Sequence, residues 1–388
     1  MSSLSRRELL GLFGTVAAGA AGFSLLGCQS KTKLVTPTSA TGLAVASGSD
    51  VHTLDGHPES AARTREILNI LRTSESSGLV AGLHRLPSRS ATLAELERVH
   101  SKEYVARIQA ATKPGTFITS SRWSPYAGPH AFTAACAAAG SALELATAID
   151  DGRVRNGFAV VRPPGHHAGR DSAAGYCIFN NVAIAAKSLQ AEKHRRIAIV
   201  DFDVHHGNGI QDTFYQDGDV LYISTHQDDW PFTGKIEMIG EGRGLGTNIN
   251  IALPLHTGDD GIKKAYDQIV VPALRRFKPD LILVAAGFDG HWRDPQGSFE
   301  LSLGGLADIC STLNHAALEL CGGKIGYILE GGYQLEVLGS GVSNALSLLS
   351  FGENSTARRT RLDPFGPSAA KTADVDGVLR IVRKIHRL

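Results

Sequence analysis

The chain contains 388 residues, of which 43% are hydrophobic and 20% are charged, so it can bury a large core and does not have the composition of a disordered protein. Its 39 Lys and Arg residues balance 38 Asp and Glu residues, which argues against a general nucleic-acid binder. Five cysteines without any Cys-x-x-Cys pair argue against a disulfide scaffold and against a thiolate zinc site.

The first thirty residues have the pattern of an export signal. Arg6-Arg7 precede a charge-free stretch from Leu9 to Gly27, and the arginine pair resembles a twin-arginine signal. Leu25-Leu26-Gly27-Cys28 resembles a lipobox, in which the cysteine is lipidated. The alternative is an uncleaved membrane anchor, but five glycines in the stretch make it a weak membrane helix.

This pattern predicts the domain organisation and the location of the protein. We expect residues 1–27 to be an export signal and Cys28 to carry the lipid. Residues 28–49, rich in Ser, Thr, Gly and Ala, are expected to form a flexible tether. Residues 50–388 then form one domain that faces the periplasm or the cell exterior, attached to the membrane only through the lipid.

Short apolar runs alternate with helical patterns along this domain. The runs lack strict alternation, as is typical of parallel strands buried on both faces. This order predicts a single α/β domain with an open parallel sheet and helices on both faces. Ligands bind beyond the carboxyl ends of such strands. The predicted strands are 157–161, 196–200, 281–286 and 325–329, and the predicted helices are 131–150, 181–193 and 261–277.

Acidic and histidine residues follow two of these strands and predict a metal site. In an extended chain Asp201, Asp203 and His205 would project to one side, and Asp289 would add a ligand from a second strand end. Three protein ligands with an open position describe a catalytic metal. Two carboxylates and one imidazole suit Zn²⁺, and also Fe²⁺ or Co²⁺. The alternative is that the acidic residues cap the helices that follow.

Two further polar clusters follow strands. His166 and His167 come after Pro163-Pro164-Gly165 and are suited to act as general base and acid beside a metal. Tyr333 follows Gly331-Gly332, and a phenol at that place can stabilise an oxyanion. The alternative for each cluster is ordinary packing at a turn.

Five motifs in order resemble the zinc-dependent histone deacetylase superfamily, which includes acetylpolyamine amidohydrolases and acetoin-utilisation proteins. The resemblance spans residues 52–333. It implies the arginase/deacetylase fold, hydrolysis of an N-acetyl amide, and a deacetylase domain over 50–388. The motifs are Arg162-Pro-Pro-Gly-His-His-Ala168, Gly175-Tyr-Cys-Ile-Phe-Asn-Asn181, Asp201-Phe-Asp-Val-His-His-Gly-Asn-Gly209, Ala286-Gly-Phe-Asp289 and Glu330-Gly-Gly-Tyr333.

The resemblance also implies a role for each matching residue. In this comparison His167 is the proton shuttle and Asp201 orients His166. Asn208 lies where the family has Asp or Asn, and the neutral side chain leaves His167 more readily neutral. The implied catalytic residues are His166, His167, Tyr333, Asp201 and Asn208. The implied zinc ligands are Asp203, His205 and Asp289.

A substrate tunnel and a second cation site are implied in the same way. The residues lining the acyl-lysine tunnel would be Gly175, Tyr176, Trp230 and Gln296. A monovalent cation, usually K⁺, would bind the backbone carbonyls of Asp201, Asp203 and His205 together with Ser224.

Two positions differ from those of protein deacetylases. Ser120 stands where family members often have an Asp that binds the substrate backbone. Gln296, after Asp294-Pro295, is polar but uncharged, whereas polyamine enzymes can carry Glu there. With the export signal, these differences predict a small-molecule or peptide acetyl-amine substrate and not a histone.

Two other functions are compatible with parts of this pattern. An arginase-like ureohydrolase shares the fold, but its chemistry requires a two-metal cluster with more carboxylates. A non-catalytic lipoprotein that binds a metal or an acyl ligand would not need His166, His167 and Tyr333. The sequence therefore favours a metal-dependent amidohydrolase.

Overall fold

The structure is a computed structural model that describes residues 40–388, except for 114–115, 120–123, 194 and 352–361. The predicted export signal, the lipidation site Cys28 and the beginning of the predicted tether lie outside the described residues. Ser120 lies outside them as well.

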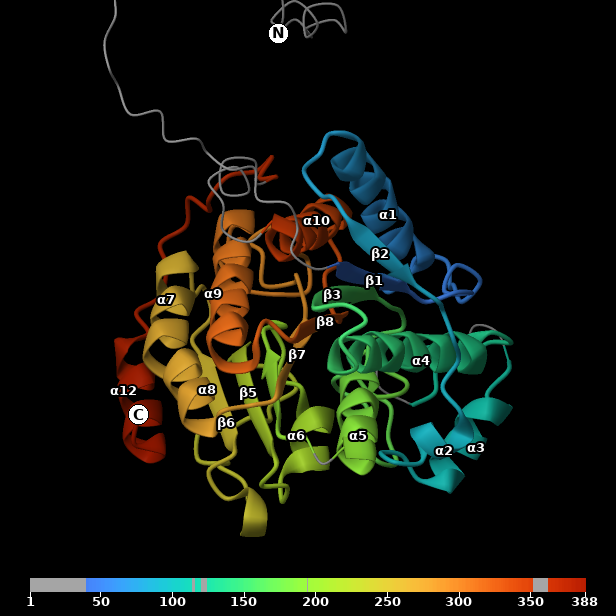
Figure 1. Cartoon of the computed structure of the whole chain (residues 1–388), viewed down its shortest axis with the longest axis horizontal. Helices are drawn as coiled ribbons and strands as arrows, with labels where there is room; N and C mark the ends of the chain where they lie inside the picture. The colour runs from blue at the N-terminus through green and yellow to red at the C-terminus, as the bar shows by residue number, and fades with distance from the viewer. Residues whose placement is uncertain (1–39, 114–115, 120–123, 194, 352–361) are drawn as a thin grey trace, which may run out of the picture. The chain divides into compact units, whose positions relative to one another are not determined.

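The described residues form one eight-stranded sheet that is entirely parallel, although its strands are not in sequence order (Figure 1). Its strands run in the order β2-β1-β3-β8-β7-β4-β5-β6, and every pair of neighbours is parallel. The strands are β1 (Thr41–Val45), β2 (Leu83–Leu86), β3 (Asn156–Val160), β4 (Ile197–Asp201), β5 (Val220–Gln227), β6 (Asn248–Leu253), β7 (Leu281–Ala286) and β8 (Ile325–Leu329).

Helices cover both faces of this sheet, as the sequence predicts. The helices α4 and α5 pack together on one face, and α1, α9 and α10 pack together on the other (Figure 1). The helical segments are α1 (Ala61–Ser76), α2 (Leu93–Leu96), α3 (Lys102–Ala110), α4 (Ala131–Asp150), α5 (Asn181–Lys193), α6 (Asn208–Phe214), η1 (Gly242–Gly244), α7 (Asp259–Ala265), η2 (Tyr266–Val270), α8 (Val271–Phe277), α9 (Leu303–Cys321), α10 (Leu335–Phe351) and α12 (Asp376–His386).

Helix α4 is the one described helix that is long and apolar enough to cross a membrane. Most of its residues are buried inside the fold, where it contacts α5, β1 and β3. Its many alanines suit this position, because small side chains let a helix lie close to a sheet and to a neighbouring helix. We therefore interpret α4 as a core helix.

Strand β1 corrects the predicted tether over 28–49. Thr41–Val45 pairs with both β2 and β3, and Leu43 and Ala44 are buried in the core. The small residues that suggested a linker have a packing role here, because a β-carbon at Gly42 would lie 3.2 Å from Leu145 of α4. The folded domain therefore begins before residue 50.

The sheet order brings the predicted polar segments together. The strands β3, β8, β7 and β4 are consecutive neighbours, and each of the predicted polar clusters follows one of them. All strands are parallel, so these four segments emerge at the same edge of the sheet. The strands themselves are buried along their whole length and supply a rigid support for that edge.

Candidate active site

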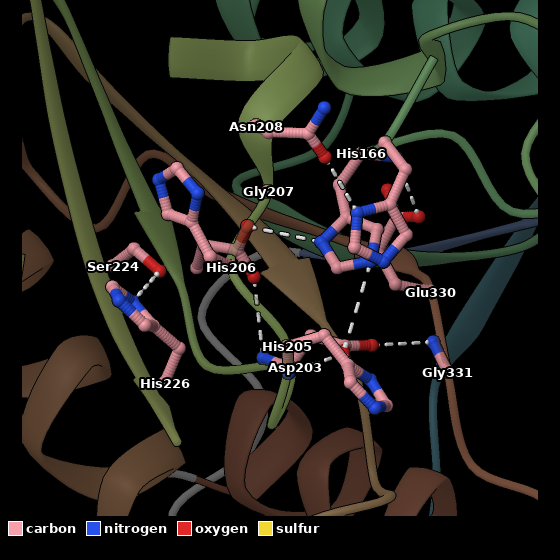
Figure 2. Close-up of polar contacts among 12 residues, drawn as sticks. His166, Asp203, His205, His206, Gly207, Asn208, Ser224, His226, Glu330 and Gly331 are labelled. Atoms are coloured by element: carbon pink, nitrogen blue, oxygen red, sulfur yellow. Dashed lines mark hydrogen bonds and ion pairs between the residues drawn. The ribbon is translucent and has the colours of Figure 1, made fainter. Parts of the chain in front are cut away.

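Three side chains predicted to bind a metal lie together at the carboxyl edge of the sheet. Asp203 and His205 belong to the loop after β4, and Asp289 belongs to the loop after β7 (Figure 2 shows the first two). One ligand atom from each residue lies within 4.8 Å of the other two. The Nδ1 atom of His205 is 3.2 Å from Asp203 Oδ1 and 3.4 Å from Asp289 Oδ2. These three residues form the metal group.

Backbone groups hold both carboxylates of the metal group. The Val204 N–H donates to Asp289 at 3.0 Å, and the Gly331 N–H donates to Asp203 at 2.8 Å. A β-carbon at residue 331 would lie only 2.0 Å from Asp289 Oδ2 and 2.5 Å from Asp203 Oδ2. Glycine is therefore required where the loop after β8 approaches the two carboxylates.

The chemistry of the metal group fits a divalent cation. Asp203 and Asp289 are 0% and 1% exposed, and burial together with the charge of Asp203 raises the pKa of Asp289. Among the described residues, Asp289 Oδ2 has no hydrogen-bond partner although it is buried. Two buried carboxylates beside one imidazole are costly without a positive charge, and a cation with oxygen and nitrogen ligands provides it.

Asp201 does not join the metal group, contrary to the expectation that alternate residues from Asp201 to His205 project to one side. Strand β4 ends at Asp201, so the alternation of an extended chain stops there. The carboxylate Oδ2 instead accepts hydrogen bonds from His166 Nδ1 at 3.2 Å and from the Tyr222 hydroxyl at 3.0 Å. This contact is the one that the family resemblance implies for Asp201.

His166 lies on a turn that a buried carboxyl group supports. Glu330 Oε2 accepts the backbone N–H of Gly165 at 2.6 Å and that of His166 at 3.0 Å. Burial raises the pKa of Glu330 to about 7. Burial alone would lower the pKa of His166, but the charges of Asp203 and Asp201 raise it to about 10. The two carboxylates therefore favour the charged form of the His166 imidazole.

His167 has the opposite electrostatic environment. Burial, followed by the neighbouring imidazoles of His166 and His205, lowers its pKa well below the usual value. Its Nδ1 donates to Asn208 Oδ1 at 2.8 Å, and a β-carbon at Gly175 would lie 2.0 Å from its ring. The ring is thus fixed in place and neutral, with its second nitrogen available to accept a proton.

Tyr333 is positioned by contacts on three sides. The Asp294 carboxylate accepts its backbone N–H at 2.6 Å, and its ring is 5.6 Å from the ring of Tyr176. The guanidinium of Arg63 lies 4.8 Å from the ring centre and donates to the Gly332 carbonyl at 2.7 Å. Burial raises the pKa of Tyr333 well above its usual value, so the hydroxyl remains a hydrogen-bond donor.

One cavity of about 340 Å³ connects these groups. Trp230 meets His167 and His205 edge-on, with ring centres 4.9 and 5.4 Å apart. The metal group, the histidine pair and Tyr333 all line the cavity. So do the four predicted tunnel residues, Gly175, Tyr176, Trp230 and Gln296.

Comparison with known proteins decides the family. The family profile described as "Histone deacetylase domain" matches residues 57–349. The chain belongs to the histone deacetylase family. It is 38% identical to "Histone deacetylase 14, chloroplastic" of Arabidopsis thaliana over 320 residues, which cover 79% of this chain and 75% of the relative. It is 39% identical to a "Probable deacetylase" of Archaeoglobus fulgidus over 284 residues, which cover 72% of this chain and 77% of the relative.

A solved structure supports the same assignment. The crystal structure of the HDA15 HD domain matches this deacetylase-family chain with a TM-score of 0.77 at 34% sequence identity, covering 89% of this chain and 95% of that one. The predicted arginase/deacetylase fold is therefore confirmed. Family membership makes the protein a hydrolase that acts on the amide bond of acetylated amines, and it favours neither the ureohydrolase nor the non-catalytic binder.

Ser224 lies next to the loop that carries the metal group of this deacetylase. It is opposite Asp201 in the register of β5 with β4, and its hydroxyl shares a 2.9 Å hydrogen bond with His226 Nδ1 (Figure 2). The carbonyl of Asp201 accepts the Thr225 hydroxyl at 3.4 Å. The predicted K⁺ site at these residues stays a prediction.

Sequence reasoning assigned no role to several residues that support or line the site. Glu59, Arg63 and Arg162 form a buried cluster behind Tyr333, although Arg162 begins one of the motifs that resemble the family. Asp229 and Phe232 line the cavity on the same loop as Trp230. The signal for these two was their place beside a predicted tunnel residue, but sequence cannot tell which way a loop residue faces.

Proposed function

We propose that this deacetylase removes an acetyl or longer acyl group from an acetylated amine by metal-assisted hydrolysis. The observation that carries the proposal is the shared cavity, where the metal group, the histidine pair and Tyr333 face the same space. A ligand set, a proton acceptor and a hydroxyl donor within one cavity of about 340 Å³ meet the requirements of amide hydrolysis.

The metal group would hold the cation, and we propose Zn²⁺ as the metal. Asp203, His205 and Asp289 supply two carboxylates and one imidazole, a set that also suits Fe²⁺ or Co²⁺. When bound, the cation supplies Lewis acidity, which polarises the acetyl carbonyl and makes water a better nucleophile near neutral pH.

His167 is the proposed proton acceptor. Because its Nδ1 donates to Asn208, the other ring nitrogen carries the lone pair. Its lowered pKa keeps the ring neutral at pH 7, so it can take a proton from the attacking water. The imidazolium that results then gives the proton to the departing amine.

Tyr333 and His166 would stabilise the charge that develops on the acetyl oxygen. The hydroxyl of Tyr333 remains protonated and its backbone is tied to Asp294, so little reorganisation is needed during the reaction. His166, which is paired with Asp201 and lines the same cavity, would add a positive charge.

A metal-loaded substrate screen tests this proposal. The purified full chain, reconstituted with Zn²⁺ and checked for stoichiometric metal, should release acetate from an acetyl-lysine fluorogenic peptide or from an acetylpolyamine. Longer acyl chains on the same peptides define the chain-length preference. If the metal is bound and no acyl-amide is hydrolysed, the proposed activity is wrong.

We further propose that the protein is an exported bacterial lipoprotein with a non-histone substrate. The twin-arginine pattern, the lipobox ending at Cys28 and the uncharged Gln296 support this proposal. A mature chain that begins with a lipid-modified Cys28, detected by mass spectrometry of the membrane fraction, is the expected result. The Cys28→Ala variant should leave that fraction. An unprocessed N-terminus in cells would contradict the proposal.

We also propose a structural K⁺ ion at the carbonyls of Asp201, Asp203 and His205 with Ser224. Its support is the register that places Ser224 beside the loop of the metal group. Replacing KCl by choline chloride should then lower the thermal unfolding temperature of the wild type, and should do so less in Ser224→Ala. Equal shifts in both proteins would contradict a role for this hydroxyl.

A further inference from the structure

The loop 227–234 forms the outer wall of the cavity, and it is fixed to the loop that carries the metal group. The Gln227 N–H donates to the Val204 carbonyl at 2.8 Å. Near the other end, the Thr233 hydroxyl shares a 2.8 Å hydrogen bond with His206 Nδ1. Because both ends are held, the residues at the tip have a defined position relative to the reacting groups.

Phe232 at this tip is unusual in two respects. Its side chain is 75% exposed although it lines the cavity, and its backbone has a φ of 62°. Residues other than glycine rarely adopt this left-handed conformation, and a bulky aromatic residue is disfavoured there. Its N–H donates to the Asp229 carbonyl at 2.8 Å, which closes a turn between the two residues. Strain of this kind is found where function requires a residue.

Asp229 carries the outermost charge of the cavity. Among the described residues that line the cavity there is no Lys or Arg, and the remaining carboxylates, Asp203 and Asp289, belong to the metal group. Gln296 and Ser298, which also line the cavity, are neutral. Asp229 is exposed, and its carboxylate has no ion-pair partner within the described part of the chain. A carboxylate placed in this way is available to a ligand.

We propose that Asp229 and Phe232 form an outer subsite that binds a second, cationic group of the substrate, beside the acetylated amine. The inference rests on the proposed function, because it concerns the substrate of the same cavity. The preferred substrates of the protein are then acetylated amines that also carry an ammonium or guanidinium group. Asp229 is the counter-ion of that group, and the aromatic ring of Phe232 is its contact surface.

The alternatives to a cation are less compatible with this wall. An anionic group would be repelled by Asp229 and by the exposed Asp228 next to it. A purely apolar group would contact Phe232 but would have to remove water from the Asp229 carboxylate without replacing its hydrogen bonds. A cation with an apolar stem satisfies both residues at once.

A charge series of substrates tests the subsite. Three acetyl-lysine peptides that differ only in the preceding residue, Arg, Gln or Glu, should be ranked in that order by kcat/KM through their KM values. Asp229→Asn should lower kcat/KM of the Arg peptide about three- to fivefold, as expected for a partly exposed ion pair, and should leave kcat unchanged. In 1 M NaCl, where charges are screened within about 3 Å, the ranking should nearly disappear.

Asp228→Asn is the matched control. Asp228 is the adjacent exposed carboxylate on the same loop, but it does not line the cavity. The Asp228→Asn variant should change the ranking of the three peptides by kcat/KM much less than Asp229→Asn does. Equal effects of the two variants would show a general surface charge and would overturn the proposed subsite.

Phe232→Gly separates binding from stability. Glycine accepts a positive φ without strain, so the thermal unfolding temperature should not fall, while KM should rise severalfold for all three peptides. A lowered unfolding temperature with unchanged KM would show a structural role for Phe232 and would overturn its part in the subsite.

The experiment distinguishes this inference from the function on which it rests. No hydrolysis of any of the three peptides by the metal-loaded wild type would count against the proposed activity. Hydrolysis of all three with equal kcat/KM values, unaffected by Asp229→Asn, would leave the activity standing and overturn the cationic subsite.

Discussion

The protein contains two buried clusters of charge that treat their carboxylates differently. Glu59, which is 1% exposed, is bound by Arg162 through two hydrogen bonds of 2.8 Å and lies 3.5 Å from Arg63. Asp203 and Asp289 are equally buried, but the two carboxylates contact the same imidazole, that of His205. Asp289 Oδ2 lacks a hydrogen-bond partner among the described residues. The first cluster has a surplus of cations and the second a surplus of carboxylates.

The difference shows how a stabilising ion cluster can be told from a ligand site. Burial alone would raise the pKa of Glu59, but the charges and hydrogen bonds of Arg162 and the charge of Arg63 lower it to about 2. In the metal group, burial and Asp203 raise the pKa of Asp289. Burial would raise the pKa of Asp203 as well, but the charges of His166 and His205 lower it, so Asp289 is the carboxylate that the fold leaves without compensation. A carboxylate that the fold itself neutralises serves stability, whereas one that the fold leaves under-neutralised requires a cation from outside.

The largest predicted effect comes from removing one carboxylate of the metal group. Asp289→Asn should lose stoichiometric zinc and reduce kcat by about ten-thousandfold, as removal of a central catalytic group does. Because it also removes charge repulsion with Asp203, it should not lower the unfolding free energy of the metal-free protein. Elemental analysis, acetate release and urea unfolding measure the three quantities.

The same chemical change in the other cluster is the control. Glu59→Gln leaves the buried charge of Arg162 without its partner and should lower the unfolding free energy by about 3–5 kcal/mol. If Asp289→Asn destabilises the metal-free protein as much as Glu59→Gln does, the distinction between the two clusters is wrong.

Tyr333→Phe should have the next largest effect, because it removes a donor to the developing oxyanion and no ligand of the metal. We expect kcat to fall about 10²- to 10³-fold while the zinc content stays equal to that of the wild type. Loss of zinc together with activity would mean that Tyr333 supports the metal group. Unchanged kcat would exclude the proposed role of its hydroxyl.

Much of the fold follows from the sequence because buried parallel strands are short, uniform apolar runs. Residues 281–286 and 325–329 agree with β7 and β8, and the predicted helix over 131–150 agrees with α4. Strand β1 escaped prediction because its glycine and alanine, which let α4 pack closely, have the composition of a linker. A sequence shows the length of an apolar run, but it does not show how closely a helix packs against that run in the fold.

The site was predictable as far as its residues follow strands. The metal group and the histidine pair were expected because each follows a strand that ends at the same edge of the sheet. The direction of Asp201 was not, since it depends on where β4 stops and the loop begins. The buried cluster around Glu59 and the position of Asp229 at the cavity depend on contacts between segments far apart in the chain. Local sequence patterns do not encode such contacts.

The arginine cluster should also give the protein a specific acid sensitivity. The pKa of Glu59 falls from 4.5 to about 2 on folding, so its ionised form stabilises the native state fully above pH 4.5. This stabilisation, about 3 kcal/mol, should be lost as the pH falls from 4.5 toward 2. The difference in unfolding free energy between wild type and Glu59→Gln should therefore shrink over that interval, and a difference that is constant with pH would contradict the assignment.

The smallest predicted effect is that of adding a carboxylate beside His167. Asn208→Asp would place a negative charge at the Nδ1 of His167, which now faces a neutral oxygen at 2.8 Å. The charge favours the imidazolium, so the pKa of His167 should rise by about one unit and the acid limb of the kcat/KM profile should move to higher pH by the same amount. Activity well above that limb should change less than tenfold.

The Asn208→Ala variant controls for this change, because it removes the hydrogen bond without adding charge and should not move the acid limb upward. If Asn208→Asp leaves the acid limb where it is, His167 is not the group whose neutral form is required. The direction of the shift is informative in itself. A histidine that serves as a base must remain neutral near pH 7, so an uncharged partner at residue 208 suits this role of His167.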